Sequence, residues 1–271
     1  MDGIGAGSTA GERERQLRQD HLQGVVAGMR RRYGPGVVRW GGDAQRSGLE
    51  TGVGSLDALF VPGGIPRGRL SWLAGAPGEG VISLGLALLA GMSRDLPVAL
   101  VDFDQGADPG DVADYGGRLE NCWWVRTSKP EPGWAAARAL VRAGVDFCLL
   151  LAERWPQMGG AVPALLQSAL EERGAVALLV GGTDVPASVG GRLGVGISCR
   201  RERWTVIHGD VAGIRVRLEV ARSRLGAPGG GCRLEIGFPR PYPNRTGIAD
   251  LGRLAARGDD LEELGAEAAG G

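Results

Sequence analysis

The amino-acid sequence predicts an α/β protein with a doubly wound, mostly parallel sheet flanked by helices. Three observations lead to this prediction. Apolar runs alternate with helix-like stretches between residues 70 and 180, which is the order of βαβ units. The runs at 145–151 and 175–180 are almost wholly apolar, as are strands that are covered on both faces. Beyond residue 195 the runs follow one another through short turns, which predicts antiparallel strands at one edge of the sheet.

Residues 11–48 predict an N-terminal helix–strand arm that is joined to the core by a polar linker. Apolar residues of the segment 11–32, Val25 among them, recur largely at spacings of three and four, which predicts an amphipathic helix. A Gly-Pro-Gly turn ends this helix and leads into a short apolar strand that contains Val37 and Val38. The arm either packs on its own core or pairs with a neighbouring molecule, and the residues taken alone favour the first arrangement.

The predicted core opens with a short helix at 56–60, for which the side chain of Ser55 can serve as an N-cap. A second N-cap is Asp108, because Pro109 follows it at the first helical position. The other predicted helices span 80–93, 109–115, 131–143 and 161–173, and the predicted parallel strands span 70–74, 98–104, 122–125, 145–151 and 175–180.

The last part of the chain predicts antiparallel strands and then one or two short, partly acidic helices. The predicted strands span 195–199, 204–208, 214–221 and 232–236, and the predicted helices span 248–257 and 259–268. The organisation expected from the sequence is a disordered tail at 1–10, the arm and linker at 11–48, the core at 49–240 and a C-terminal tail with short helices at 241–271.

The most informative stretch is the glycine-rich turn between the first parallel strand and the helix that follows it. Gly75 and Gly80 have the spacing of a P-loop, in which glycine N–H groups and a helix N-terminus hold phosphate. Gly78 lies between them. The next two positions, which are lysine and a hydroxyl residue in that motif, are Val81 and Ile82. Neither side chain can contact phosphate or bind Mg²⁺.

Composition narrows the classes of function. The chain has 31 basic and 31 acidic residues, so net charge gives no general attraction to nucleic acid. Its four cysteines are far apart without a Cys-x-x-Cys pair, which predicts free thiols in a reducing cytoplasm and no metal site. Neither a signal peptide nor an apolar run of the ~18–20 residues that span a membrane is recognisable. A cytoplasmic protein without a cofactor or membrane contact is therefore expected.

Several motifs, in the same order along the chain, resemble the RecA family of recombinases. The resemblance covers about residues 12–240. It implies a RecA-like fold, an arm that docks on the next protomer, and a late segment, Arg222–Pro228, like the one that reaches a neighbour's ATP in that family. The motifs are Leu49–Asp57, Gly63–Gly68, Gly75–Gly80 and Val101–Pro109.

The chain also departs from the family pattern. Leu151 stands where the family has its Walker B acid, and Asp104 stands where it has a catalytic glutamate. The two loops that bind DNA in the family are short here, and the family's C-terminal domain has no visible counterpart. The comparison therefore implies a degenerate nucleotide site and no ATPase activity. The residues of that site are Gly75, Gly78, Gly80, Val81, Ile82, Asp104 and Leu151.

This combination of likeness and loss is similar to the ImuA-type RecA-like accessory proteins of bacterial mutasomes. The similarity implies a non-catalytic role in DNA-damage-induced (SOS) translesion mutagenesis. The implied partners are a RecA filament, a Y-family polymerase homologue and an error-prone polymerase, and whether the chain contacts DNA directly or through them stays open. The residues expected to bind partners are Val25, Val37, Val38, Arg222 and Arg224.

Other functions stay open. A divergent ATPase could use Asp104, and Asp102 and Asp104 at a strand end are either structural or part of a ligand site. Arg222 and Arg224 alternate along a predicted strand, so they share a face that is either solvated or directed at phosphate on a neighbouring subunit. A DNA-binding module could use a basic strip beside Trp204, although a solvated sheet edge is favoured there. The strip consists of Arg200, Arg201, Arg203, Arg215 and Arg217.

Overall fold

The computed structural model describes five residues of the N-terminal segment and most of the remaining chain up to Leu254. The chain forms two compact units, residues 1–45 and residues 46–271. In the first unit the described residues are helical, and the side chains of Val25 and Met29 are 47% and 40% exposed. The described residues are 21, 24, 25, 28 and 29, and 48–254 without 62, 156–158, 186, 226–229, 241 and 242.

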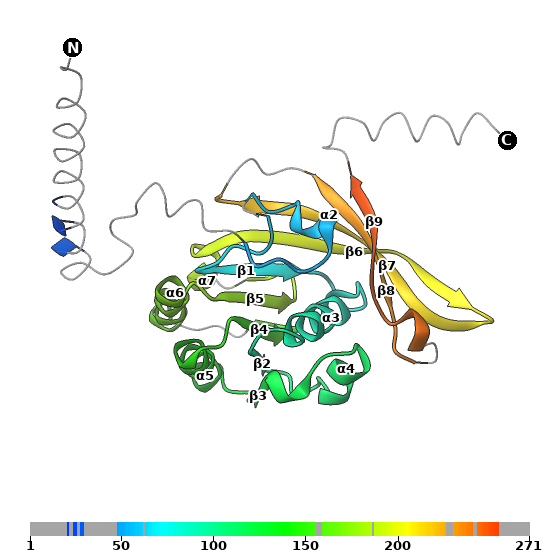
Figure 1. The fold of residues 1–271 in the computed structure, drawn as a ribbon, viewed down its shortest axis with the longest axis horizontal. Helices are drawn as coiled ribbons and strands as arrows, with labels where there is room; N and C mark the ends of the chain where they lie inside the picture. Colours follow the sequence, from blue (N-terminus) through cyan, green and yellow to red (C-terminus); the bar gives the residue numbers. More distant parts are fainter. Residues whose placement is uncertain are drawn as a thin grey trace, which may run out of the picture. The chain divides into compact units, whose positions relative to one another are not determined.

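The second unit is built on one nine-stranded sheet in the order β3-β2-β4-β5-β1-β6-β7-β8-β9 (Figure 1). The strands from β3 to β6 in this order are all parallel, and β7, β8 and β9 add antiparallel neighbours beyond β6. The bounds are β1 Arg69–Ala74, β2 Val98–Asp102, β3 Cys122–Arg126, β4 Phe147–Ala152, β5 Val176–Gly181, β6 Leu193–Ile207, β7 Asp210–Ser223, β8 Gly231–Gly237 and β9 Gly247–Leu254.

Helices cover both faces of the parallel part of the sheet (Figure 1). The side chains of α3 pack with one set of alternating strand residues, and those of α5 and α6 pack with the other set. Two apolar cores result, one on each face, which explains why β2, β4 and β5 are buried at every position. Among the described residues of this unit, the α-helices are α2 Gly54–Asp57, α3 Val81–Ser93, α4 Pro109–Asp114, α5 Pro130–Ala143, α6 Ala161–Arg173 and α7 Ala187–Gly190, and the 3-10 turns are η2 Leu119–Asn121 and η3 Pro243–Arg245.

The predicted mixed sheet with a parallel centre, flanking helices and antiparallel edge strands is confirmed. The N-cap at Asp108 is also confirmed, because its carboxylate accepts a hydrogen bond from the N–H of Gly110 at 2.8 Å. The predicted cap at Ser55 is wrong. The first helix of the core begins at Gly54 with Val53 as its N-cap, and the backbone N–H of Ser55 donates to the carboxylate of Asp250 at 2.7 Å.

Two predictions about the C-terminal part are wrong. The strands predicted at 195–199 and 204–208 are one strand, β6, because a register shift between Arg201 and Arg203 absorbs the polar residues between them. The helix predicted at 248–257 is strand β9, which pairs with β8. The segment forms a strand because it pairs with β8, and a local sequence pattern does not show such a pairing. The arm strand and the residues 259–268 lie outside the described residues.

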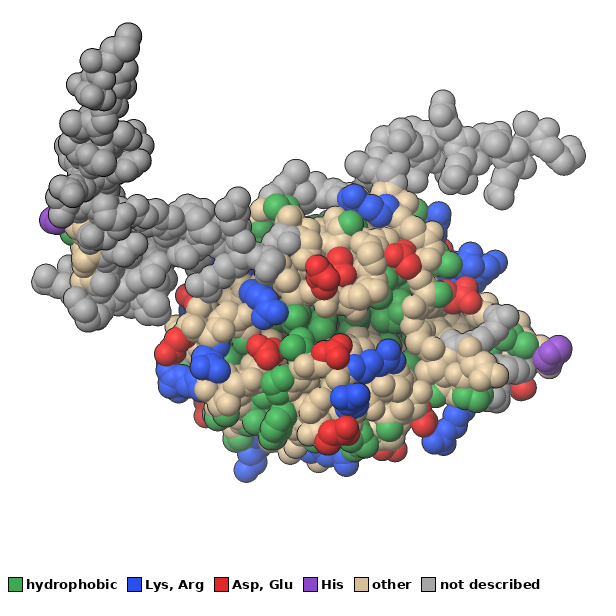
Figure 2. All heavy atoms as spheres, viewed as in Figure 1, with side chains coloured by type: hydrophobic (Ala, Val, Ile, Leu, Met, Phe, Trp, Pro, Cys, Tyr) green, Lys and Arg blue, Asp and Glu red, His purple; other side chains and the backbone are tan. Residues whose placement is uncertain are grey.

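The surface in Figure 2 shows acidic and basic side chains interspersed among apolar and neutral ones. Within the described part of the chain, no helix combines the length and the apolar character needed to cross a membrane. All four cysteines are free thiols, and three of them are buried.

Candidate functional site

The glycine-rich loop lies between β1 and α3, at the carboxyl ends of the parallel strands. Sheets of this type bind ligands at that edge. Gly80 is the N-cap of α3 in a left-handed conformation, with φ 82°. A Cβ at this position would lie 3.0 Å from Cδ1 of Ile214 and 3.2 Å from Cγ1 of Val216. Glycine is therefore required both by the backbone and by the closeness of β7.

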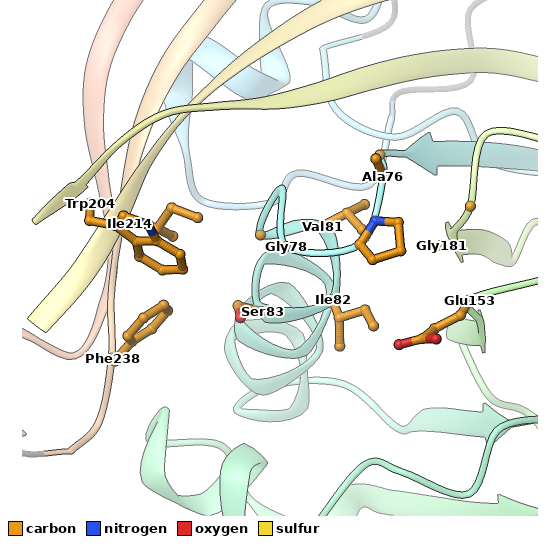
Figure 3. Close-up of a pocket in the computed structure, with 14 residues that line it drawn as sticks. Ala76, Gly78, Val81, Ile82, Ser83, Glu153, Gly181, Trp204, Ile214 and Phe238 are labelled. Carbon is orange, nitrogen blue, oxygen red and sulfur yellow. The ribbon is translucent and has the colours of Figure 1, made fainter. Parts of the chain in front are cut away.

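A pocket of about 160 Å³ opens in front of the loop and the first turn of α3. In Figure 3, Trp204 and Phe238 lie on one side of this turn, and Ile82 and Glu153 lie on the other. The two aromatic rings meet edge to face, with their centroids 6.4 Å apart. The pocket is lined by Gly75, Ala76, Pro77, Gly78, Gly80, Val81, Ile82, Ser83, Glu153, Gly181, Gly182, Trp204, Ile214 and Phe238.

Five of the residues predicted for the nucleotide site line this pocket: Gly75, Gly78, Gly80, Val81 and Ile82. Val81 points mainly into the core and is 4% exposed, whereas Ile82 is partly exposed and packs at the edge of the same core. Ser83 brings a hydroxyl group to the pocket one position further along α3. Leu151 is buried in the core within β4 and does not line the pocket.

The side chain of Glu79 fastens the loop to β6. Its carboxylate accepts a hydrogen bond from the backbone N–H of Arg201. The Arg201 guanidinium in turn donates to the Gly78 carbonyl at 3.1 Å and lies 4.7 Å from the centroid of the Trp204 ring. The Glu79 carboxylate is therefore engaged by the neighbouring strand.

The two acids at the end of β2 have different roles in the structure. Asp102 is fully buried, and its carboxylate accepts hydrogen bonds from the backbone N–H groups of Asp104, Gln105 and Ala107 at 2.9–3.1 Å. These bonds hold the loop after β2 in place. Asp104 accepts a hydrogen bond from the backbone N–H of Glu153, which links this loop to the end of β4. Asp104 is thereby beside the pocket but not part of its lining.

Glu153 is the acid that the sequence interpretation missed. It follows β4 by one residue and lines the pocket opposite the aromatic pair (Figure 3). The sequence signal for Glu153 is an acid directly after a buried strand. The sequence analysis placed the Walker B acid at Leu151, which is two residues too early. Among the described residues, no group of three or more histidine, cysteine, aspartate or glutamate side chains is arranged to hold a metal ion.

Tyr115 adds a polar contact under the first turn of α3. Burial raises the pKa of its hydroxyl to about 12, with the charge of Asp111 adding to the effect and a hydrogen bond with Ser83 opposing it. The Ser83 hydroxyl is thus tied to α4 through a phenol that stays protonated at neutral pH.

The predicted partner-binding arginines do not both lie on a strand. Arg222 lies within β7, is exposed, and donates from Nη1 to the Gly190 carbonyl at 3.0 Å. Arg224 follows the end of β7, and its backbone N–H donates to the Gly194 carbonyl at 2.9 Å. Val25 is in the arm helix, while Val37 and Val38 lie outside the described residues. The role of these five residues in partner binding therefore stays a prediction.

Comparison with known proteins finds RecA relatives along most of the chain. The RecA protein of Ruminococcus albus is 24% identical across 89% of this chain and 68% of its own length. RecA of Streptomyces ambofaciens is 24% identical across 87% of this chain and 73% of its own length. RecA of Macrococcus caseolyticus reaches 30% identity, but over 49% of this chain and only 39% of the relative. No protein-family model matches.

A solved structure supports the fold independently. The crystal structure of the RadB recombinase matches 75% of this chain and 99% of its own with a TM-score of 0.59 at 15% identity. A likeness at this identity establishes the fold, and the RecA relatives connect that fold to a family.

These comparisons correct the expectation that the chain is not an enzyme. Its relatives are RecA proteins and its structural match is a recombinase, which suggests a RecA-family ATPase. The residues do not exclude this, because the glycine-rich loop, the N-terminus of α3 and the acid Glu153 surround the pocket. The presence of Val81 and Ile82 at the lysine and hydroxyl positions is therefore not sufficient to infer a loss of ATPase activity. By its relatives and its fold, the chain is similar to the RecA proteins and has a RecA-like fold.

Proposed function

We propose that this chain binds the RecA filament and acts beside it in DNA-damage-induced mutagenesis, in the manner of the ImuA-type accessory proteins. A role related to DNA repair or recombination follows from its family. The more specific proposal adds the partners: a RecA filament, a Y-family polymerase homologue and an error-prone polymerase. A cytoplasmic location belongs to the same proposal and is supported by the four free thiols.

The observation that supports filament binding most is the apolar face of the arm helix. Val25 and Met29 are four residues apart, which places them on one side of a helix, and both side chains are exposed. An exposed apolar stripe on an amphipathic helix is typical of a helix that docks in a partner's groove. We infer that the arm, including Val37 and Val38, contacts the adjacent RecA subunit.

Arg222 and Arg224 form the second part of the proposed interface. Arg222 is exposed on β7 next to the end of α7, and its bond to a backbone carbonyl leaves the remaining guanidinium donors available to an anion. We propose that this pair approaches phosphate on a neighbouring active subunit. For the polymerase partners, the exposed strand β9 and the chain after it are the proposed contact.

Co-sedimentation tests the proposed partner. RecA filaments assembled on single-stranded DNA with a slowly hydrolysed ATP analogue are pelleted with the full chain, and RecA without DNA serves as the control. The proposal expects the chain in the pellet only with filaments, and less of it when Arg222 and Arg224 are both changed to Ala. Equal recovery with and without filaments would remove RecA from the list of partners.

A divergent ATPase is the second candidate function, and the pocket in front of α3 favours it. Glycine N–H groups, the Ser83 hydroxyl and the Glu153 carboxylate all lie around one cavity at a helix N-terminus. Calorimetry with Mg²⁺–ATP and a phosphate-release assay test this candidate. An ATPase of this kind loses binding in Gly78→Trp, which fills the cavity, and loses turnover but keeps binding in Glu153→Gln. Absence of ATP binding at millimolar concentration would eliminate it.

A further inference from the structure

The pocket in front of α3 has a negative charge in its lining and none of the chain's basic side chains. Among the described residues that line it, Glu153 is acidic and none is lysine or arginine. The carboxylate of Glu79 lies beside the same loop. The motif lysine is replaced by Val81, and the chain's sole lysine, Lys129, is the N-cap of α5 on the opposite face of the sheet. Because like charges repel, a phosphate chain needs an arginine at this pocket.

Arg201 on β6 lies at the edge of this pocket. Its Nη1 donates a hydrogen bond to the carbonyl of Gly78 at 3.1 Å, and its guanidinium carbon lies 4.7 Å from the centroid of the Trp204 ring. Both Gly78 and Trp204 line the pocket (Figure 3). The guanidinium of Arg201 therefore contacts two walls of the pocket, one from the glycine-rich loop and one from β6.

The register shift in β6 places Arg201 and Trp204 on the same face of the sheet. Arg201 pairs with Val216 and Trp204 pairs with Ile214, and both partners on β7 are buried on the α3 side. Residues three apart on a regular strand point to opposite faces. Here Glu202 is the extra residue of a bulge, so the alternation is shifted by one and Trp204 points to the pocket side as Arg201 does. The bulge thus brings a cation and an indole ring together at the loop.

The guanidinium of Arg201 has N–H donors left for an anion. An arginine has five such donors, and within the described part of the chain this one uses a single donor, to the Gly78 carbonyl. The Glu79 carboxylate accepts from the backbone N–H of Arg201 and not from its guanidinium. Stacking on Trp204 orients the guanidinium plane without using its donors. Arg201 is also exposed, so a ligand in the pocket can reach it from solvent.

We propose that Arg201 supplies the phosphate-binding cation that the loop lacks at Val81. This inference rests on the ATPase candidate above and names the residue that lets the pocket take the phosphate chain of a nucleoside triphosphate. Guanidinium matches phosphate oxygens in both geometry and charge. The positive charge that the motif places on the helix after the loop thus comes from β6, a strand that is distant in the sequence and adjacent in the fold.

Calorimetry of the full chain with Mg²⁺–ATP and with inorganic tripolyphosphate tests this assignment. Arg201→Gln removes the charge but keeps a polar side chain, and we expect it to bind both ligands about tenfold more weakly at low salt. Arg201→Lys keeps the charge and loses the fork of donors, so its affinity should lie between the two. Glu79→Gln removes a negative charge beside the loop and keeps an acceptor for the Arg201 N–H, so it should bind both ligands more tightly.

The matched control is Arg203→Gln, which removes the same charge from the same strand. Arg203 pairs with Arg215, whose neighbours Ile214 and Val216 are buried on the α3 side, so Arg203 points away from the pocket. This control should bind both ligands like the unaltered chain. Measurements at about 50 mM and about 500 mM salt separate a phosphate contact from a structural role, because salt screens the charge of an exposed arginine. The effect of Arg201→Gln should therefore be smaller at high salt.

Equal ATP affinity of Arg201→Gln and Arg203→Gln would overturn the inference and leave the ATPase candidate intact. A loss in Arg201→Gln that is the same at both salt concentrations would also overturn it, because Arg201 would then only hold the loop through Gly78. Arg201-dependent binding of tripolyphosphate by a chain that binds no ATP would support the cation and eliminate the ATPase. Binding of neither ligand by the unaltered chain would overturn both. Thermal midpoints of all variants establish that each is folded.

Discussion

Asp102 shows how a residue with catalytic chemistry can serve the fold. Its carboxylate is fully buried and accepts three backbone hydrogen bonds, so it has little capacity left for a substrate or metal. The sequence left open whether Asp102 and Asp104 are structural or functional. The described contacts use Asp102 to shape the loop after β2, and they use Asp104 to hold the end of β4.

Replacing Asp102 should therefore destabilise the protein strongly. We expect Asp102→Ala to lower the free energy of unfolding by about 3 kcal/mol, because it leaves three backbone N–H groups without their acceptor. Asp102→Asn keeps one carbonyl oxygen and should lose less. Urea unfolding followed by circular dichroism measures both. A loss below about 1 kcal/mol in the alanine variant would show that water replaces the carboxylate.

The thiols should be unreactive in the folded protein. Burial raises the pKa of Cys148 and Cys199 to about 12 and that of Cys232 to about 11, all above the ordinary value of 9.0. Thiolate is the reactive form of cysteine. In the folded chain at pH 8, a thiol reagent should therefore modify Cys122 alone, and slowly. After unfolding it should modify all four cysteines. Rapid modification of three or more thiols in the folded chain would contradict this burial.

The same shifts make stability depend on pH in the alkaline range. A thiol with a raised pKa in the folded state contributes stability that is fully present below pH 9.0. Above that pH the unfolded chain loses its protons first, so stability falls up to about pH 12. The raised pKa of Tyr115 acts in the same direction. Urea midpoints between pH 8 and pH 11 should therefore decline, and a flat profile would contradict the assignment.

At the level of elements, the N-cap glycine of α3 and a glycine within this helix have opposite roles. Gly80 has φ 82° and touches β7, whereas a Cβ on Gly91 would have open space around it. We expect Gly80→Ala to destabilise by about 2 kcal/mol, and Gly91→Ala to stabilise by up to about 1 kcal/mol because alanine favours a helix. Thermal unfolding compares the two. If both variants shift in the same direction, the left-handed cap at Gly80 is not the determinant.

Elements with local signals were predicted closely, and those that depend on distant partners were not. The bounds of α6 agree with the prediction, and α4 and α5 agree to one residue, because glycine, proline and cap residues mark their ends. Strand β9 was mistaken for a helix because its structure depends on pairing with β8. For the site, the sequence located the loop, but it could not show that Trp204, Phe238 and Glu153 gather around it.

For the whole molecule, the two compact units suggest that arm and core are separable. Residues 46–271 contain the complete sheet and both apolar cores. We expect a chain without residues 1–45 to unfold at nearly the same temperature as the full chain but to lose binding to RecA filaments. A drop of the thermal midpoint of more than about 5 °C would show instead that the arm stabilises its own core.

The central claim is that the chain binds a RecA filament through the apolar face of its arm. Biolayer interferometry on immobilised RecA–DNA filaments tests it most directly with the variant Val25→Asp. The control is Val61→Asp, which changes an exposed valine on the surface of the second compact unit. The account predicts that the control binds like the unaltered chain, while Val25→Asp keeps its thermal midpoint and binds at least about tenfold more weakly. Normal filament binding by a fully folded Val25→Asp chain would contradict the account, as would a loss of stability in that variant, because the arm would then pack on its own core.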